Sequence, residues 1–288
     1  MQFKEGDIVA RKSHQGDVYF KIVEVLVDNQ GNQMAVLRGL DVRLMADAPC
    51  DDLEIKDHSQ VRQYRQSFVR ENHTSLQRIF SSRSLQRGEE TENTKKNDES
   101  NTFELPGRIL HIDGDPDYLN LCLTAYRQLG IEVYGYVIPE NEQPGKVVQL
   151  LREHLPDILV VTGHDGLINT KGDFKEINNY RTSRYFVESV RNARQFDKSK
   201  DDLIIFAGAC QSHYEALIKA GANFASSPKR ILIHAFDPVL AVETLAYAPI
   251  DRTVPVAEVI KNTISGQDGV GGIQTRGRYR VGIPKSTY

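Results

Sequence analysis

Two short apolar runs, each followed by small residues, constrain the fold of this chain most strongly. Residues 158–161 read Ile-Leu-Val-Val and continue into Thr-Gly-His-Asp-Gly, while residues 203–206 read Leu-Ile-Ile-Phe and continue into Ala-Gly-Ala-Cys-Gln. Apolar runs of this length, rich in β-branched residues and bounded by glycine, are typical of buried parallel strands. Because chemistry gathers at the carboxyl edge of open α/β sheets, we expect His164 and Cys210 to lie together at that edge.

An imidazole and a thiol at one sheet edge predict a cysteine–histidine dyad. A thiol attacks a carbonyl as its thiolate, and a nearby base is needed to form that thiolate. The segment Gly-Ala-Cys-Gln at 208–211 is also close to the caspase pattern Gln-Ala-Cys-(Arg/Gln/Gly), in which the histidine lies about 50 residues upstream. The other two cysteines, Cys50 in a polar turn and Cys122 within a helix, are interpreted as structural.

The expected mechanism is acyl transfer through a thioester. Cys210 attacks the scissile carbonyl, and His164 protonates the leaving amine and then helps to activate water. The backbone amides of Cys210 and of the turn containing Gly163, Asp165 and Gly166 are the expected oxyanion donors. His213, three residues after Cys210, is interpreted as structural, as are two histidines on apolar strands, His111 and His234.

Composition and charge exclude several classes of protein. The 288 residues carry a formal net charge of −3, which argues against general nucleic-acid binding. Three cysteines do not make a disulfide framework, and no His/Cys cluster has zinc spacing, so neither a metal nor another cofactor is expected. No stretch approaches 18 apolar residues and the amino terminus has no apolar signal core, so we expect a soluble intracellular protein without a membrane segment.

The chain divides into three predicted parts. Residues 1–58 contain short strands and turns and predict a small SH3-like β-barrel for docking. Residues 59–104 predict a basic helix over 61–80 and a disordered polar linker over 81–102. Residues 105–288 alternate strands and helices, which predicts an α/β fold with a doubly wound parallel sheet, the fifth strand being residues 231–235.

The whole chain resembles the sporulation-specific YabG peptidases of endospore-forming bacteria. The resemblance runs from Gly-Asp-Ile-Val at 6–9 through Thr-Gly-His-Asp-Gly and Gly-Ala-Cys-Gln-Ser-His to Gly-Gly-Ile-Gln-Thr-Arg-Gly at 271–277. It implies a cysteine endopeptidase of the mother cell cytoplasm that associates with the forespore coat. Its implied partners are spore coat and coat-assembly proteins, which it would cleave after basic residues.

The layout of strand, histidine and cysteine also resembles the caspase, gingipain, clostripain and separase superfamily, which implies a caspase-like fold. In that superfamily a glycine commonly follows the histidine directly. Here Asp165 separates His164 from Gly166, which leaves open the identity of the second oxyanion donor.

Cleavage after a basic residue requires a carboxylate in the pocket that receives it, because a buried guanidinium must be paired. Asp113, Asp115 and Asp237 follow predicted strands on the edge that should carry the dyad. We rank Asp113 first. A solvated turn or a helix cap is the alternative role for each, and Asp115 before Pro116 looks like a helix start.

Three arginines in or beside the predicted linker, Arg78, Arg83 and Arg87, are candidate self-cleavage sites, because a protease cleft needs an extended, flexible chain. Their alternative role is to keep the linker soluble.

Two functions from other classes compete with a peptidase. Residues 109–116 resemble the opening of a receiver domain, but the third strand ends at Thr-Gly-His, without the phosphoacceptor aspartate. A non-catalytic scaffold of coat assembly would leave the paired His164 and Cys210 as a coincidence.

Overall fold

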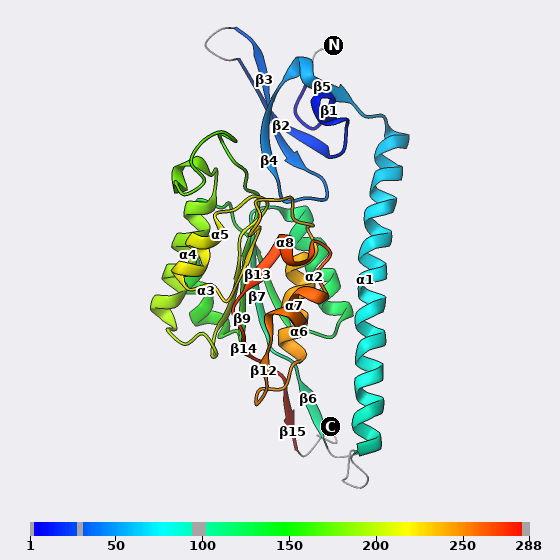
Figure 1. The fold of residues 1–288 in the computed structure, drawn as a ribbon, viewed down its shortest axis with the longest axis vertical. Helices are drawn as coiled ribbons and strands as arrows, with labels where there is room; N and C mark the ends of the chain where they lie inside the picture. Colours follow the sequence, from blue (N-terminus) through cyan, green and yellow to red (C-terminus); the bar gives the residue numbers. More distant parts are fainter. Residues whose placement is uncertain (1–2, 28–30, 94–101, 284–288) are drawn as a thin grey trace.

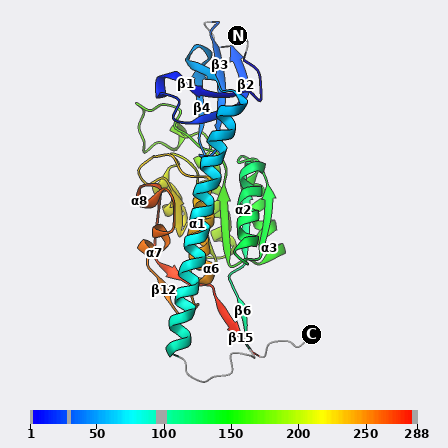
Figure 2. The ribbon, with the colours of Figure 1, turned by 90° about the vertical axis from the view of Figure 1, so that its right-hand side faces the viewer.

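The computed structural model describes residues 3–27, 31–93 and 102–283, which form an N-terminal sheet, one long helix and a larger α/β unit (Figure 1). The N-terminal sheet lies at one end of the α/β unit. The long helix runs beside both, as the two perpendicular views agree (Figure 2).

The N-terminal sheet is antiparallel and five-stranded, in the order β4-β3-β2-β1-β5. Its alternate side chains, such as Phe20, Ile22 and Leu37, are buried, as expected for a half-buried sheet. The strand-rich prediction is confirmed, whereas the SH3-like closure stays a prediction, because the pairings among the described residues leave β4 and β5 as edges. The strands are β1 (Ile8–Arg11), β2 (Tyr19–Val27), β3 (Gln33–Gly39), β4 (Met45–Pro49) and β5 (Leu53–Ile55), with 3₁₀ turns at Lys12–His14 and Cys50–Asp52.

Helix α1 (His58–Asn93) is longer than the sequence predicted. The predicted linker is wrong as far as Asn93, and residues 94–101 lie outside the described residues. The helix packs on the α/β unit as far as Arg83: Ile79 is buried, and Arg83 donates to Glu243 Oε1 at 2.8 Å and to the Leu129 carbonyl at 3.1 Å. A polar composition did not predict order because these partners lie far away in sequence.

The α/β unit is built on a six-stranded sheet in the order β13-β11-β10-β9-β7-β8, parallel except for β13. Strand order reverses between β7 and β9, which is the switch point where open α/β sheets bind ligands. The strands are β7 (Ile109–Asp113), β8 (Val133–Val137), β9 (Ile158–Thr162), β10 (Ile204–Ala207), β11 (Phe224–Ser226) and β13 (Val270–Gly272).

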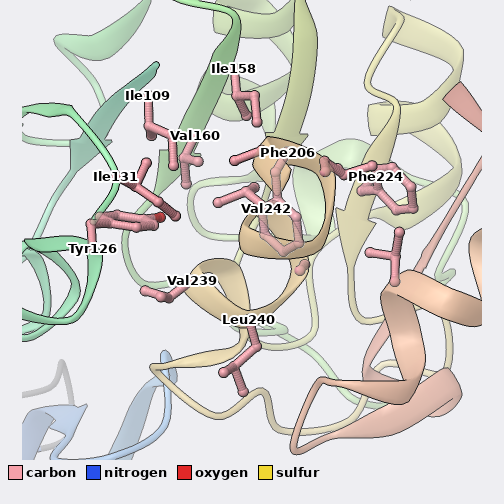
Figure 3. Packing of buried hydrophobic residues seen from close by; sticks show 14 of the residues in the cluster. Ile109, Tyr126, Ile131, Ile158, Val160, Phe206, Phe224, Val239, Leu240 and Val242 are labelled. Carbon is pink, nitrogen blue, oxygen red and sulfur yellow. The ribbon is translucent and has the colours of Figure 1, made fainter. Parts of the chain in front are cut away.

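Helices cover both faces of this sheet, which confirms the predicted α/β class. One face packs on α2 (Pro116–Gln128) and α6 (Asp237–Tyr247), and the other on α3 (Gln143–His154), α4 (Ser183–Phe196) and α5 (Tyr214–Ala220). Figure 3 shows the first core, where Val239 and Val242 of α6 face strand residues such as Phe206. The remaining elements are a 3₁₀ turn at Ile177–Asn179, α7 (Val256–Lys261), α8 (Gly266–Gly269), and the pairs β12 (Thr253–Val254) with β14 (Thr275–Arg276) and β6 (Phe103–Leu105) with β15 (Arg280–Gly282).

The predicted fifth strand at 231–235 is wrong. The strand beside β10 is β11, whose short Phe-Ala-Ser run carries little sequence signal. Residues 231–235 instead lie against the loop of residues 40–44 that joins β3 to β4, with a bridge between Val42 and His234. No helix within the described residues is long and apolar enough to cross a membrane.

Candidate active site

The sheet brings His164 and Cys210 to the same edge. Strands β9 and β10 pair in register, with Val161 opposite Ala207, and each candidate lies three residues further along its own chain. Gly208 makes the turn into Cys210 possible, because its φ of +108° is unfavourable for other residues and an added Cβ would lie 2.9 Å from Leu217. Both His164 and Cys210 have 0% of their surface exposed.

One carbonyl oxygen joins the two candidate segments. The Arg43 carbonyl accepts hydrogen bonds from the backbone N–H of Cys210 at 3.1 Å and of Asp165 at 3.2 Å. Two convergent backbone donors are what an oxyanion hole requires. The two amides that donate to this carbonyl are that of Cys210 and, from the His164 turn, that of Asp165.

The Cys210 thiol lies against the extended segment 231–235. Its Sγ accepts from the Ile233 N–H at 3.0 Å and lies 3.5 Å from the Ile233 carbonyl. Burial raises the pKa of the thiol well above its ordinary value, and the Ile233 N–H opposes this only in part. Burial in this arrangement therefore favours the neutral thiol over the thiolate.

The His164 ring is buried without a hydrogen-bond partner for either nitrogen in the described part of the chain. The nearest carboxylate oxygens are Asp115 Oδ2, 3.7 Å from Nε2, and Glu140 Oε1, 4.0 Å from Nδ1. Burial, assisted by the positive charge of Arg38, lowers the pKa of His164 to about 3. A buried polar side chain without partners is expected to have one at some stage of function, and a neutral imidazole can accept a proton.

Asp165 holds the two turns together. Its carboxylate accepts from the N–H groups of Gly166 and Thr182 at 2.9 Å each and from the hydroxyls of Ser183 and Ser212. Ser212 also accepts from the Ala209 N–H at 2.9 Å. These bonds link the His164 turn to the Cys210 turn and fix the spacing of the two backbone donors.

The Arg43 guanidinium is fully buried and paired at the same edge of the sheet. Nη1 donates to Asp113 Oδ2 at 2.7 Å, Nη2 donates to the Ala235 carbonyl at 3.1 Å, and the guanidinium carbon lies 4.9 Å from the centre of the Tyr118 ring. Burial alone would raise the pKa of Asp113, but the charge of Arg43 holds it well below its ordinary value. Asp113 is thus an ionised carboxylate paired with a fully buried guanidinium.

The other two acidic candidates have different positions. Asp115 caps α2 by accepting from the Asp117 and Tyr118 N–H groups at 2.8 and 3.1 Å, so its alternative role as a helix start is observed. Asp237 accepts from the N–H groups of Ile264 and Ser265 at 2.6 and 3.3 Å, and burial raises its pKa to about 6. Neither carboxylate bonds to the Arg43 guanidinium, which is paired with Asp113.

The three histidines that the sequence suggested as structural, His111, His213 and His234, do have structural contacts. His213 caps α5 through Nδ1, and its Nε2 lies 3.0 Å from the Lys175 carbonyl. His111 Nε2 lies 2.8 Å from the Thr162 hydroxyl, and the His234 ring stacks on Phe68.

Sequence reasoning missed three residues that contact the Arg43 guanidinium. Tyr118 and Cys122, four residues apart on one face of α2, both face Arg43, with Cys122 Sγ 3.7 Å from Nη2. Their i, i+4 spacing beside the strand that ends at Asp113 was a usable signal. Ala235 contributes a backbone carbonyl, which no residue type reveals.

Comparison with known proteins gives two matches. The family model described as YabG peptidase U57 matches residues 4–284. The curated protein "Sporulation-specific protease YabG" of Bacillus subtilis (strain 168) is 43% identical over 286 residues, covering 99% of each chain.

Proposed function

The chain belongs to the YabG peptidase U57 family, and we propose that it is a cysteine endopeptidase that cleaves after arginine or lysine, with Cys210 as nucleophile and His164 as its base. Membership makes it a sporulation protease. The catalytic type, the dyad and the specificity are the proposal.

One observation carries the proposal: a single arginine of the chain meets both halves of the site at once. The Arg43 carbonyl accepts from the Cys210 and Asp165 amides, while its side chain ends on Asp113. A substrate with arginine before its scissile bond needs the same two contacts, because its carbonyl must enter the oxyanion hole while its cation is paired.

The chemistry follows from these positions. Cys210 loses its proton to His164 and attacks the carbonyl carbon, and the Cys210 and Asp165 amides stabilise the oxyanion. His164 then protonates the leaving amine. Water hydrolyses the thioester, with His164 as base, and restores the thiol. Asp115 and Glu140, close to the imidazole, favour its protonated form while a substrate is bound.

The substrates we propose are spore coat and coat-assembly proteins, met in the mother cell cytoplasm at the forespore surface. The support is the name of the relative, a sporulation-specific protease. We also propose a caspase-like arrangement of the α/β unit, since the candidate dyad lies at the carboxyl edge of a largely parallel sheet.

The test is a panel of otherwise identical peptides with arginine, lysine, glutamine or leucine before one fixed bond. We expect kcat/KM for the arginine and lysine peptides to exceed that for the glutamine and leucine peptides by about 100-fold or more, because a buried carboxylate left unpaired costs about 2–5 kcal/mol. Mass spectrometry of the products locates the cut. Equal cleavage of all four peptides would refute the proposed specificity.

A further inference from the structure

The loop of residues 40–44 pairs through its backbone with residues 233–235, beside Cys210. The Arg43 N–H donates to the Ile233 carbonyl at 3.3 Å, and the Ala235 N–H donates to the Asp41 carbonyl at 2.9 Å. Between them, Val42 bridges His234 in the antiparallel sense. Backbone pairing to an exposed strand edge, with side chains entering pockets, is a common way to bind an extended peptide.

Three requirements of a substrate meet at Arg43. Its carbonyl lies between the Cys210 and Asp165 amides, its guanidinium is paired with Asp113, and its N–H is paired with Ile233. Arg43 is 0% exposed, although arginine is almost never fully buried unless it is paired. On the following side, the Met45 N–H donates to the Asp165 carbonyl at 2.8 Å, so the chain is held on both sides of the Arg43–Leu44 bond.

We propose that Arg43–Leu44 is a peptide bond that this peptidase cleaves in its own chain, and that residues 41–44 close the site to other substrates until it is cut. The inference rests on the proposed function and adds to it a self-processing site and a form of regulation.

The step is the proposed chemistry acting within one molecule. Cys210 Sγ bonds to the Arg43 carbonyl carbon, the bond from that carbon to the Leu44 nitrogen breaks, and the Leu44 amine takes the proton that His164 received from the thiol. Water then cleaves the thioester, leaving a carboxylate on Arg43, an amine on Leu44 and a free thiol. The products are residues 1–43 and residues 44–288.

Closure explains the state of the dyad in the intact chain. With the loop in place, Cys210 and His164 are both buried, and burial shifts both pKa values toward the neutral forms. Once the bond is cut, Arg43 becomes a chain end that can leave the pocket, and water and other substrates reach the site.

The Arg43–Leu44 bond is a better candidate for self-cleavage than the bonds after the three arginines of the predicted linker. Arg78 and Arg83 lie within α1, and the Arg83 guanidinium is bound to Glu243 and lies 3.4 Å from the centre of the Tyr247 ring. Arg87 also lies within the bounds of α1. A helix must unwind before it can enter a protease cleft, whereas residues 41–44 lie outside any helix and already pair through their backbone with Ile233 and Ala235.

The experiment follows the full-length chain by mass spectrometry under denaturing conditions, with N-terminal sequencing. Denaturing conditions are needed because the cut lies between β3 and β4, whose pairing would hold the two fragments together. Wild type is expected to yield residues 1–43 and 44–288 at a rate that does not change over about a 100-fold range of protein concentration, as for a segment already docked in its own site. Arg43→Lys keeps the charge and should still be cut. Arg43→Gln and Cys210→Ala should stay whole, and Arg83→Gln, the matched control on α1, should be cut like wild type.

Activity on the arginine peptide, measured on the same samples, should rise at least 10-fold as the wild-type chain is cut. A wild-type chain that cleaves the peptide but keeps its Arg43–Leu44 bond overturns the self-processing site and leaves the proposed function standing. Full activity of the intact chain overturns the proposal that residues 41–44 close the site. If wild type cleaves neither itself nor any peptide of the panel, the proposed function fails as well. Circular dichroism confirms that each variant is folded, and Arg43→Lys provides the test if Arg43→Gln is not.

Discussion

Cys210→Ala is expected to abolish peptide cleavage, lowering kcat/KM for the arginine peptide by about 10⁴-fold or more, because no other group can form the thioester. Cys210→Ser should be almost as inactive, since a serine hydroxyl is a far weaker acid than a thiol and His164 is placed to serve a thiol. Steady-state kinetics on the purified variants measure both losses.

The same prediction extends to His164→Ala, which removes the base. Residues that act as a unit are not additive, so the double variant should be little worse than either single one. Cys50→Ala, which changes a buried cysteine of the N-terminal sheet, is the matched control and should retain activity. Substantial turnover by Cys210→Ala would contradict the whole catalytic assignment.

Asp113→Asn is expected to remove the preference for basic residues. The substitution keeps the shape of the side chain but removes the charge that faces the guanidinium. Removing one partner of a buried charge pair costs about 2–5 kcal/mol of binding free energy, so kcat/KM for the arginine peptide should fall by about 100-fold or more. The glutamine peptide, which does not use that charge, should lose much less. The informative quantity is therefore the ratio of the two rates, which a general loss of stability would leave unchanged.

Asp237→Asn is the control for Asp113→Asn. Asp237 is equally buried and follows the segment that lines the pocket, but its carboxylate accepts from Ile264 and Ser265 rather than from Arg43. The ratio of kcat/KM for the arginine peptide to kcat/KM for the glutamine peptide should stay within about threefold of the wild-type ratio. Only a carboxylate that is paired with the charge of the substrate should couple to it. A collapse of the ratio in Asp237→Asn but not in Asp113→Asn would place the pocket elsewhere.

The sheet and its edge could be predicted from the sequence because buried parallel strands are local signals. The apolar runs before His164 and Cys210 each fit one strand, and both strands lie where expected, in register with each other. Asp113 was predictable for the same reason, since it ends the first strand of the α/β unit.

The occupant of the pocket could not be predicted in this way. Arg43 lies in a loop of the N-terminal sheet, and its partners are residues 70 and 192 positions away in sequence. The segment 231–235 was mistaken for a strand of the main sheet because its apolar pattern does not say which partner it pairs with. Helix α1 was underestimated because packing far along the chain, at Ile79 and Arg83, overrode its polar composition.

Covalent labelling of the thiol tests the central claim most directly. Self-processed wild type is treated with a peptidyl arginine chloromethyl ketone, and the modified residue is mapped by mass spectrometry. The account predicts one label per chain, on Cys210, with complete loss of activity, and none on Cys50 or Cys122. It also predicts that His164→Ala labels far more slowly, because the base that forms the thiolate is gone. Loss of activity without a label on Cys210 would contradict the assignment of Cys210 as the nucleophile.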